Sequence, residues 1–175
     1  MSALVVIFHL LLLGSGSDLD YGVGVVEDRF EGFTKTYMSH NLIPNEPGLP
    51  IRLDDIVATG LGAMVIEYEE GETSFLIFAE ISSEDWLFLS RVNLLLNDTT
   101  RVCLDNPLEP VRDVFNGICC ERVMFEVEPQ LIWEIALADT VEIKLSGDDY
   151  YRIRALSPVN VQRFYEFAMQ YIPET

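Results

Sequence analysis

The sequence predicts an α+β domain in which an antiparallel β-sheet built from hairpins is covered by two helices near the C-terminus. The first two thirds of the 175 residues hold short apolar and alternating runs separated by turn residues, which is typical of antiparallel strands. Helical periodicity is confined to the last third, where the expected order is β-α-β-β-α. Strands grouped before helices, with no linker long enough to divide the chain, indicate a single domain.

One strand and a long loop are expected early in the chain. Residues 34–39 are β-branched and aromatic enough to predict a strand, whereas the glycine-rich residues 21–26 are too weakly patterned. Residues 41–50 contain three prolines, which cannot donate ladder hydrogen bonds, and predict a loop. Residues 51–59 fit either a short strand or a helical turn.

The middle of the chain begins with a predicted hairpin. Residues 61–69 alternate, and Glu70-Gly71 supplies the turn into residues 73–81. The near-continuous apolar stretch in residues 73–81 is typical of a central strand covered on both faces.

A second hairpin is predicted from residues 92–96 and 99–104. Asn97-Asp98 lies between them, and both side chains tolerate the positive φ of a tight turn. Residues 105–117 contain two prolines and an Asn-Gly pair, so they predict a connection and not a strand.

The last third carries the clearest helix signals. Residues 121–127 predict a strand, and Glu128-Pro129 then begins a helix with proline at its first position. Ser157-Pro158 is an N-cap followed by proline at the start of the last helix, which Pro173 ends. The apolar face of the first helix consists of Leu131, Ile132, Ile135 and Ala136, and that of the second of Val161, Phe164, Phe167, Ala168, Tyr171 and Ile172.

A further hairpin lies between these helices, formed by residues 140–145 and 150–156. A two-residue loop would place Ile143 opposite Arg152, whereas a three-residue loop would place it opposite Ile153. Because burial of one face sets strand register, the three-residue loop is the prediction.

The N-terminus predicts an export signal over residues 1–17, followed by the domain over residues 18–175. Residues 3–13 form an apolar run of the length found in secretory signals, and residues 14–17 are small. The run is too short to span a membrane. The expected location is therefore secreted or periplasmic.

Two features complicate this interpretation of the N-terminus. No Lys or Arg precedes Arg29, and Ser15 occupies the position where a lipobox would carry its lipid-bearing Cys. No stable membrane anchor is expected after cleavage. The alternative is a cytoplasmic protein whose N-terminal run is part of the folded core.

The net charge of -18, from 29 acidic and 11 basic residues, restricts the partners. A surface this negative repels phosphate backbones, so no nucleic-acid partner is expected. The charge serves solubility or tolerance of salt on one interpretation, and a basic partner or a cation on the other. The protein partner stays unidentified.

Three cysteines allow either one disulfide or three reduced thiols. Cys103 could pair with Cys119 or Cys120 in an exported protein, and no Cys-x-x-Cys pair indicates zinc.

No residue qualifies as catalytic, cofactor-binding or metal-binding, and no cofactor is expected. The nucleophile-elbow, phosphate-loop, dinucleotide and zinc-protease motifs are absent from the sequence. Carboxylates are frequent, but a solvated surface explains them better than a calcium site. The acidic candidates are Glu67, Glu69, Glu70 and Glu72 at one hairpin, with Asp18, Asp20, Asp148 and Asp149 elsewhere.

Four aromatic residues are the candidates for a binding surface: Trp86, Trp133, Tyr150 and Tyr151. Trp133 lies off the apolar stripe of its helix, so it is either partly exposed or packed under a loop. The sequence thus favours a small exported, non-enzymatic domain that binds a partner or serves the cell envelope. The alternatives are a carboxylate-based hydrolase with a site assembled from distant residues, and an intracellular acidic interaction protein.

Overall fold

The computed structural model describes residues 21–39, 41–43, 58–148 and 150–174. The predicted export signal, Asp18, Asp20, Asp149 and most of the predicted loop over 41–50 lie outside these residues. Sheet A contains β1 (Gly22–Asp28), β2 (Phe33–Ser39), β3 (Leu42–Ile43), β4 (Ala58–Tyr68), β5 (Thr73–Ser83), β8 (Val111–Phe115) and β9 (Ile118–Glu126). Sheet B contains β6 (Arg91–Leu96), β7 (Thr100–Leu104), β10 (Val141–Ser146) and β11 (Tyr151–Ala155), and the helices are α2 (Pro129–Ala136) and α3 (Pro158–Tyr171).

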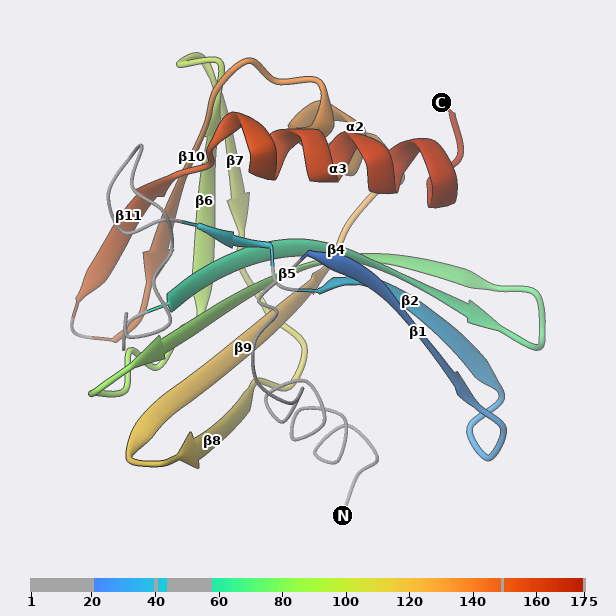
Figure 1. The fold of residues 1–175 in the computed structure, drawn as a ribbon, viewed down its shortest axis with the longest axis horizontal. Helices are drawn as coiled ribbons and strands as arrows, with labels where there is room; N and C mark the ends of the chain where they lie inside the picture. Colours follow the sequence, from blue (N-terminus) through green and yellow to red (C-terminus); the bar gives the residue numbers. More distant parts are fainter. Residues whose placement is uncertain (1–20, 40, 44–57, 149, 175) are drawn as a thin grey trace.

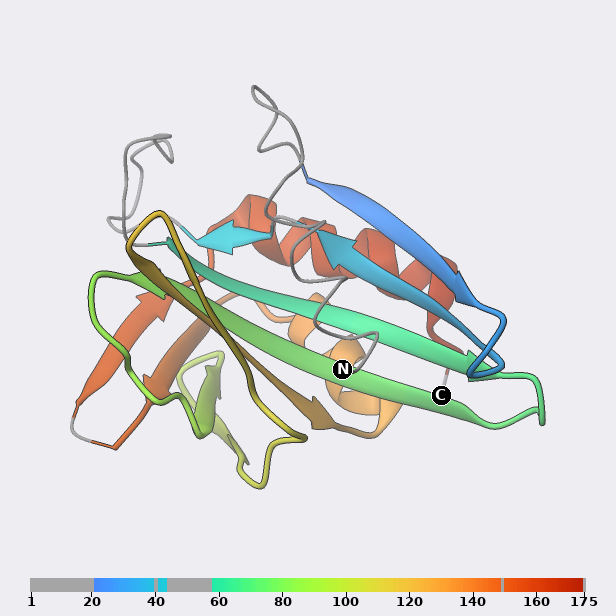
Figure 2. The same cartoon turned by 90° about the horizontal axis from the view of Figure 1, so that it is seen from below.

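Both sheets are antiparallel throughout. Sheet A has the order β1-β2-β4-β5-β9-β8, with β3 paired to β4, and sheet B has the order β11-β10-β6-β7. Sheet A arches, and α2, α3 and sheet B all lie on its outer side (Figure 1). Figure 2 looks at the opposite face, with the helices behind the strands. We call this opposite side the inner face of sheet A.

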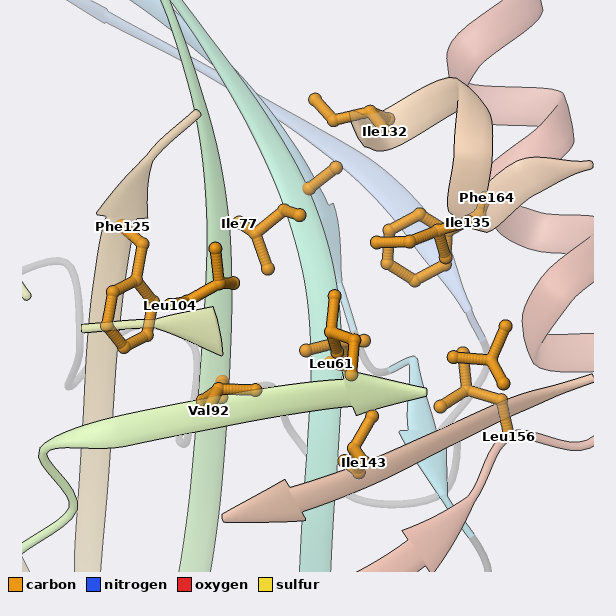
Figure 3. Packing of buried hydrophobic residues seen from close by; sticks show 14 of the residues in the cluster. Leu61, Ile77, Val92, Leu104, Phe125, Ile132, Ile135, Ile143, Leu156 and Phe164 are labelled. Atoms are coloured by element: carbon orange, nitrogen blue, oxygen red, sulfur yellow. The ribbon is translucent and has the colours of Figure 1, made fainter. Parts of the chain in front are cut away.

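The main core fills the space between sheet A, sheet B and the two helices. Leu61 and Ile77 from sheet A meet Ile143 from sheet B, and Ile135 and Phe164 from the helices close the core (Figure 3). Alternate residues of β10 are buried, as expected for a strand with one face on a core.

Helix α3 begins where the sequence predicts. The Ser157 Oγ accepts a hydrogen bond from the Asn160 N–H at 3.2 Å, and the Asn160 Oδ1 accepts from the Ser157 N–H at 3.1 Å. The Asn160 amide also donates to the Leu42 carbonyl and the Asn41 side chain, each at 2.8 Å. The cap therefore ties the start of α3 to β3.

The α+β class and the β-α-β-β-α ending are confirmed, because β9, α2, β10, β11 and α3 follow one another as expected. The Asn97-Asp98 turn is confirmed as well, with φ of 51° and 57° at the two residues. The strands form two sheets where one was expected. Hairpin signals fix neighbouring pairs, but they do not say that β6 pairs with β10, 45 residues later in the chain.

Three strands were missed, and the shortest is β3, which pairs with β4 at Leu42–Ile43 inside the predicted loop over residues 41–50. Gly22–Asp28 forms the edge strand β1, and Val111–Phe115 forms the edge strand β8 inside the predicted connection. Edge strands carry weak patterns because they need not bury a full face. The Asn116-Gly117 pair is the hairpin turn between β8 and β9, with φ of 51° and 82°.

The predicted register of the last hairpin is wrong. Ser146 pairs with Tyr151, which leaves four residues in the turn, and Ile143 faces Arg154 instead of Ile153. Because β11 is the edge of sheet B, side chains on its core-facing side reach the rim of the sheet. Arginine stems are accommodated there, and burial alone does not select the register.

Candidate functional site

A buried carboxylate organises the loop of residues 84–90, which joins sheet A to sheet B. Glu121 of β9 is 1% exposed and points to the same side of sheet A as the core. Its oxygens accept hydrogen bonds from the backbone N–H groups of Leu87 at 2.6 Å, Phe88 at 3.0 Å and Leu89 at 2.9 Å. The Arg112 Nε–H donates to it at 3.2 Å and supplies the counter-charge. The three backbone hydrogen bonds fix the path of the loop.

This path forces Phe88 outward. Leu87 and Leu89 are 1% and 0% exposed, whereas Phe88 between them is 45% exposed. Its φ is +53°, a left-handed conformation that is uncommon for a residue with a bulky side chain. Such a conformation persists where the surroundings over-determine it, and it concentrates at binding and catalytic sites. The Glu121 carboxylate provides that constraint here.

Three aromatic side chains gather around this loop, and we call Trp86, Phe88 and Tyr150 the aromatic surface. The rings of Trp86 and Phe88 have centroids 6.2 Å apart at an angle of 33°. The Tyr150 hydroxyl donates to the Trp86 carbonyl at 2.9 Å, which ties the β10–β11 turn to the loop. The guanidinium of Arg112 lies 5.4 Å from the Phe88 ring centroid, and that of Arg152 lies 5.9 Å from that of Tyr150. The surface thus combines Trp, Tyr, Phe and Arg, a composition close to that of interface hot spots.

Gly147 allows the turn and the loop to touch. A Cβ at this position would lie 1.7 Å from the Leu87 carbonyl oxygen, closer than any side chain tolerates. Only glycine permits this approach, so the sequence fixes the loop from both sides, through Glu121 and through Gly147.

The structure brings together two of the four aromatic residues that the sequence singled out. Trp86 and Tyr150 meet in the aromatic surface. Trp133 is 9% exposed, donates from Nε1 to the Pro173 carbonyl at 3.0 Å and packs edge-on against Tyr165, so it belongs to the core. Tyr151 is 59% exposed on the outer side of sheet B, with the Lys144 ammonium 4.2 Å from its ring centroid.

The acidic candidates do not converge. Glu67, Glu69 and Glu72 are exposed around the β4–β5 hairpin, and Asp148 is exposed in the β10–β11 turn. Across the part of the chain that the structure describes, no three His, Cys, Asp or Glu side chains are grouped so that they could hold a metal ion.

The three cysteines are free thiols. Cys103 is exposed on sheet B, whereas Cys119 and Cys120 are buried neighbours on β9 whose side chains point to opposite faces of sheet A. Burial raises the pKa of the Cys120 thiol, and the hydrogen bond with Ser82 lowers it by less. Cys120 is therefore held as a neutral thiol.

Phe88, Arg112 and Glu121 were missed at the sequence level. Glu121 carried a usable signal, because it has the same parity as Val123 and Phe125 in its strand and so had to face the core. A carboxylate on a core face needs hydrogen-bond donors around it, so this position predicts a buried group of polar contacts at Glu121. No sequence pattern predicts the placement of Phe88 and Arg112, since their positions follow from the contacts that Glu121 makes.

Two further observations concern the whole chain. Within the described ranges, no helix is both long and apolar enough to cross a membrane. No protein-family model, curated protein or solved structure shows significant similarity to this chain, so the site rests on its own geometry.

Proposed function

We propose that this protein is a small exported, non-enzymatic domain that binds a basic protein partner through the aromatic surface. The observation that carries the proposal is Phe88, which is held at φ +53° with its ring in solvent. A buried carboxylate and a glycine that cannot be replaced both act to present it. A pre-organised aromatic side chain contributes to binding without an ordering cost.

The charge of the protein supports a basic partner. A net charge of -18 attracts cationic proteins over a long range and speeds their encounter. Glu84 and Asp85 are exposed next to Trp86, so carboxylates accompany the rings. A Lys or Arg side chain of a partner can then lie over the Trp86 ring and pair with these carboxylates, whereas the Phe88 ring already faces the Arg112 guanidinium.

Export is the second part of the proposal and rests on residues 3–13. Mass spectrometry of protein made in a bacterium with an intact secretion system tests it. Loss of the first 16 or 17 residues supports export. An intact N-terminus in the cytosol favours the intracellular alternative.

The hydrolase alternative calls for two carboxylates in one cleft. Two surface grooves of the described residues hold one carboxylate each, Glu142 in the groove on sheet B and Glu134 in the groove between α2 and the β6–β7 turn. No observation at either groove favours a paired acid and base.

Tryptophan fluorescence tests the binding surface directly. The chain has two tryptophans, so Trp133→Phe leaves Trp86 as the sole reporter. Titration with a twelve-residue peptide of alternating Arg and Gly should change its emission saturably. Phe88→Ala should weaken binding at least tenfold, about 1.4 kcal/mol.

Phe30→Ala is the matched control, because Phe30 is fully exposed at the β1–β2 turn. Its affinity should equal that of the parent. Equal affinities for all three proteins would mean that the peptide responds to net charge alone, and the aromatic surface would lose its assigned role.

A further inference from the structure

The face of sheet B that points away from the main core carries a groove. Alternate residues of β6 and β10 are buried in the core, so the residues between them point to this outer face. The groove has a volume of about 290 Å³, near the lower end of the range for small-molecule sites. Its lining comes from all four strands and includes Leu95 of β6, Arg101 and Cys103 of β7, Lys144 of β10 and Ile153 of β11. We call it the sheet B groove.

The pairing of the strands explains why this face is hollow along β6. Asn93 of β6 pairs with Lys144 of β10, and Leu95 pairs with Arg101 of β7. Asn93 and Leu95 are half-buried, whereas the longer Lys144 and Arg101 side chains are exposed. The short side chains of β6 therefore form the floor of the groove, and one cationic side chain stands on each side of it.

The charge of this outer face is opposite to that of the whole chain. Its strands present three basic side chains, Arg91, Arg101 and Lys144, and one carboxylate, Glu142. Among the residues that the structure describes, no carboxylate forms an ion pair with any of the three. In a chain with 29 acidic and 11 basic residues, such a face is an exception to the composition. At short range, it therefore attracts an anion.

Glu142 restricts where the anionic group binds and how much charge it carries. It lies in the same cross-strand row as Leu95 and Arg101. Lys144 lies in the next row, opposite Asn93. Repulsion from the Glu142 carboxylate keeps an anion toward Lys144, where the Asn93 amide can donate a hydrogen bond to it. One carboxylate beside the two cations also favours a ligand with a single negative charge.

The rest of the groove is suited to an apolar chain. Ile153 of β11 is 52% exposed, and Tyr151, two residues earlier on the same face, is 59% exposed. The Lys144 ammonium lies over the Tyr151 ring, so Ile153 and Leu95 are the apolar side chains beside the cation. A chain that lies on Leu95 and Ile153 removes their surface from water, which is favourable in proportion to the area buried.

We propose that the sheet B groove binds a fatty-acid anion with a short apolar chain. The Lys144 ammonium and the Arg101 guanidinium bind its carboxylate, and its chain lies on Leu95 and Ile153. Among the described residues, the groove and the aromatic surface have none in common, so this proposal does not depend on the basic protein partner.

Alkylation of Cys103 in the full chain tests the proposal. This thiol is exposed and lines the groove, whereas Cys119 and Cys120 are buried. Trypsin separates Cys103, in peptide 102–112, from the other two, in peptide 113–122, so mass spectrometry follows the reaction of each peptide with iodoacetamide. We expect octanoate, below the concentration at which it forms micelles, to slow alkylation of Cys103 saturably and to leave the buried thiols unaffected. Equal effects on both peptides would mean that octanoate acts on the whole fold, and this would contradict the proposal.

Three other probes separate the contributions of charge and chain. Affinity should increase from acetate to octanoate, by up to roughly fourfold for each CH₂ group that is buried. Octyltrimethylammonium, which has the same chain length and the opposite charge, should give no protection. Protection by acetate equal to that by octanoate, protection by octyltrimethylammonium, or stronger protection by a peptide of alternating Glu and Gly would each overturn the proposal. The last result would assign the face to an acidic protein.

Lys144 is the residue whose replacement tests the contact with the carboxylate. Lys144→Gln should weaken octanoate binding roughly tenfold, because it removes a charged hydrogen-bond donor from the site. Arg29→Gln is the matched control, since it removes the same charge from an exposed turn outside the groove, and its affinity should equal that of the parent. Equal affinities for Lys144→Gln and the parent, or no protection of Cys103 by octanoate in the parent, would show that the groove is not this site.

Discussion

Glu121 shows how one residue can hold in place a surface, here the aromatic surface, that it does not itself belong to. Its carboxylate accepts three backbone hydrogen bonds and pairs with Arg112 while it is 1% exposed. A buried charge is tolerated only where such donors satisfy it. The exposed position of Phe88 depends on this satisfied charge.

Glu121→Gln should lower the free energy of unfolding by about 3 kcal/mol, because the neutral amide supplies fewer acceptors and leaves Arg112 without its charge partner. Urea denaturation measures the change. Glu72→Gln, at an exposed turn, is the control and should stay within about 0.5 kcal/mol of the parent. A decrease in the free energy of unfolding below about 1 kcal/mol for Glu121→Gln would show that the Glu121 hydrogen bonds do not hold the loop.

Lys35 is a second charged residue that lies in a buried position. It is 5% exposed on the inner face, and burial lowers its pKa, as does the nearby Arg122 guanidinium, while Asp28 acts in the opposite direction. The folded state therefore disfavours the charged form. In the window between the lowered pKa and the ordinary value of 10.5, the unfolded chain binds more protons, so the contribution of Lys35 to stability rises with pH.

Lys35→Met should accordingly raise the free energy of unfolding by about 1 kcal/mol at pH 7, since an apolar side chain of similar length replaces a buried charge. The gain over the parent should shrink as the pH approaches 10.5. Denaturation at pH 7 and pH 10 measures both effects. A gain that grows with pH would contradict the assigned direction of the pKa shift.

At the scale of elements, α3 closes the main core. Phe164 and Phe167 are 0% and 1% exposed, and Ala168 is fully buried on the same face. The capping box and the Asn160 contacts with Asn41 and Leu42 set the start of the helix, so the two phenylalanines arrive over sheet A in a fixed position.

Phe164→Ala or Phe167→Ala should lower the free energy of unfolding by about 3–5 kcal/mol, because each change leaves a cavity in a closed core. Val159→Ala on the exposed side of α3 should have little effect. Chemical denaturation of the three variants checks this. Losses below about 1 kcal/mol at both phenylalanines would mean that α3 does not close the core.

At the scale of the whole molecule, the net charge of -18 acts against folding through self-repulsion. Mobile ions screen that repulsion, with a Debye length of about 10 Å at 0.1 M salt. The exposed carboxylates around the β4–β5 hairpin contribute to it and are spread over the turn.

The melting temperature should therefore rise gradually with NaCl and should not respond specifically to Ca²⁺. Thermal melts at a fixed high NaCl concentration, with and without sub-millimolar Ca²⁺, measure the difference. A calcium-dependent increase of several degrees that Glu67→Gln abolishes would identify a metal site at this hairpin.

Local chemistry was sufficient to predict the elements whose signals lie within a few residues. The proline at the start of each helix, the Ser157 cap, the Asn97-Asp98 turn and the two long strands of the first hairpin all follow from the backbone preferences of their own residues. The α+β class follows in turn from their order along the chain.

The tertiary structure alone decided which strands distant in the sequence meet, and so it decided the site. The pairing of β6 with β10 created a second sheet, and the close approach at Gly147 and the Tyr150 hydrogen bond hold the β10–β11 turn against the loop of residues 84–90. Phe88 faces solvent because a carboxylate 33 residues away in the chain holds its backbone N–H. Sequence patterns report the preferences of neighbouring residues, whereas a contact between distant residues depends on how the whole chain packs.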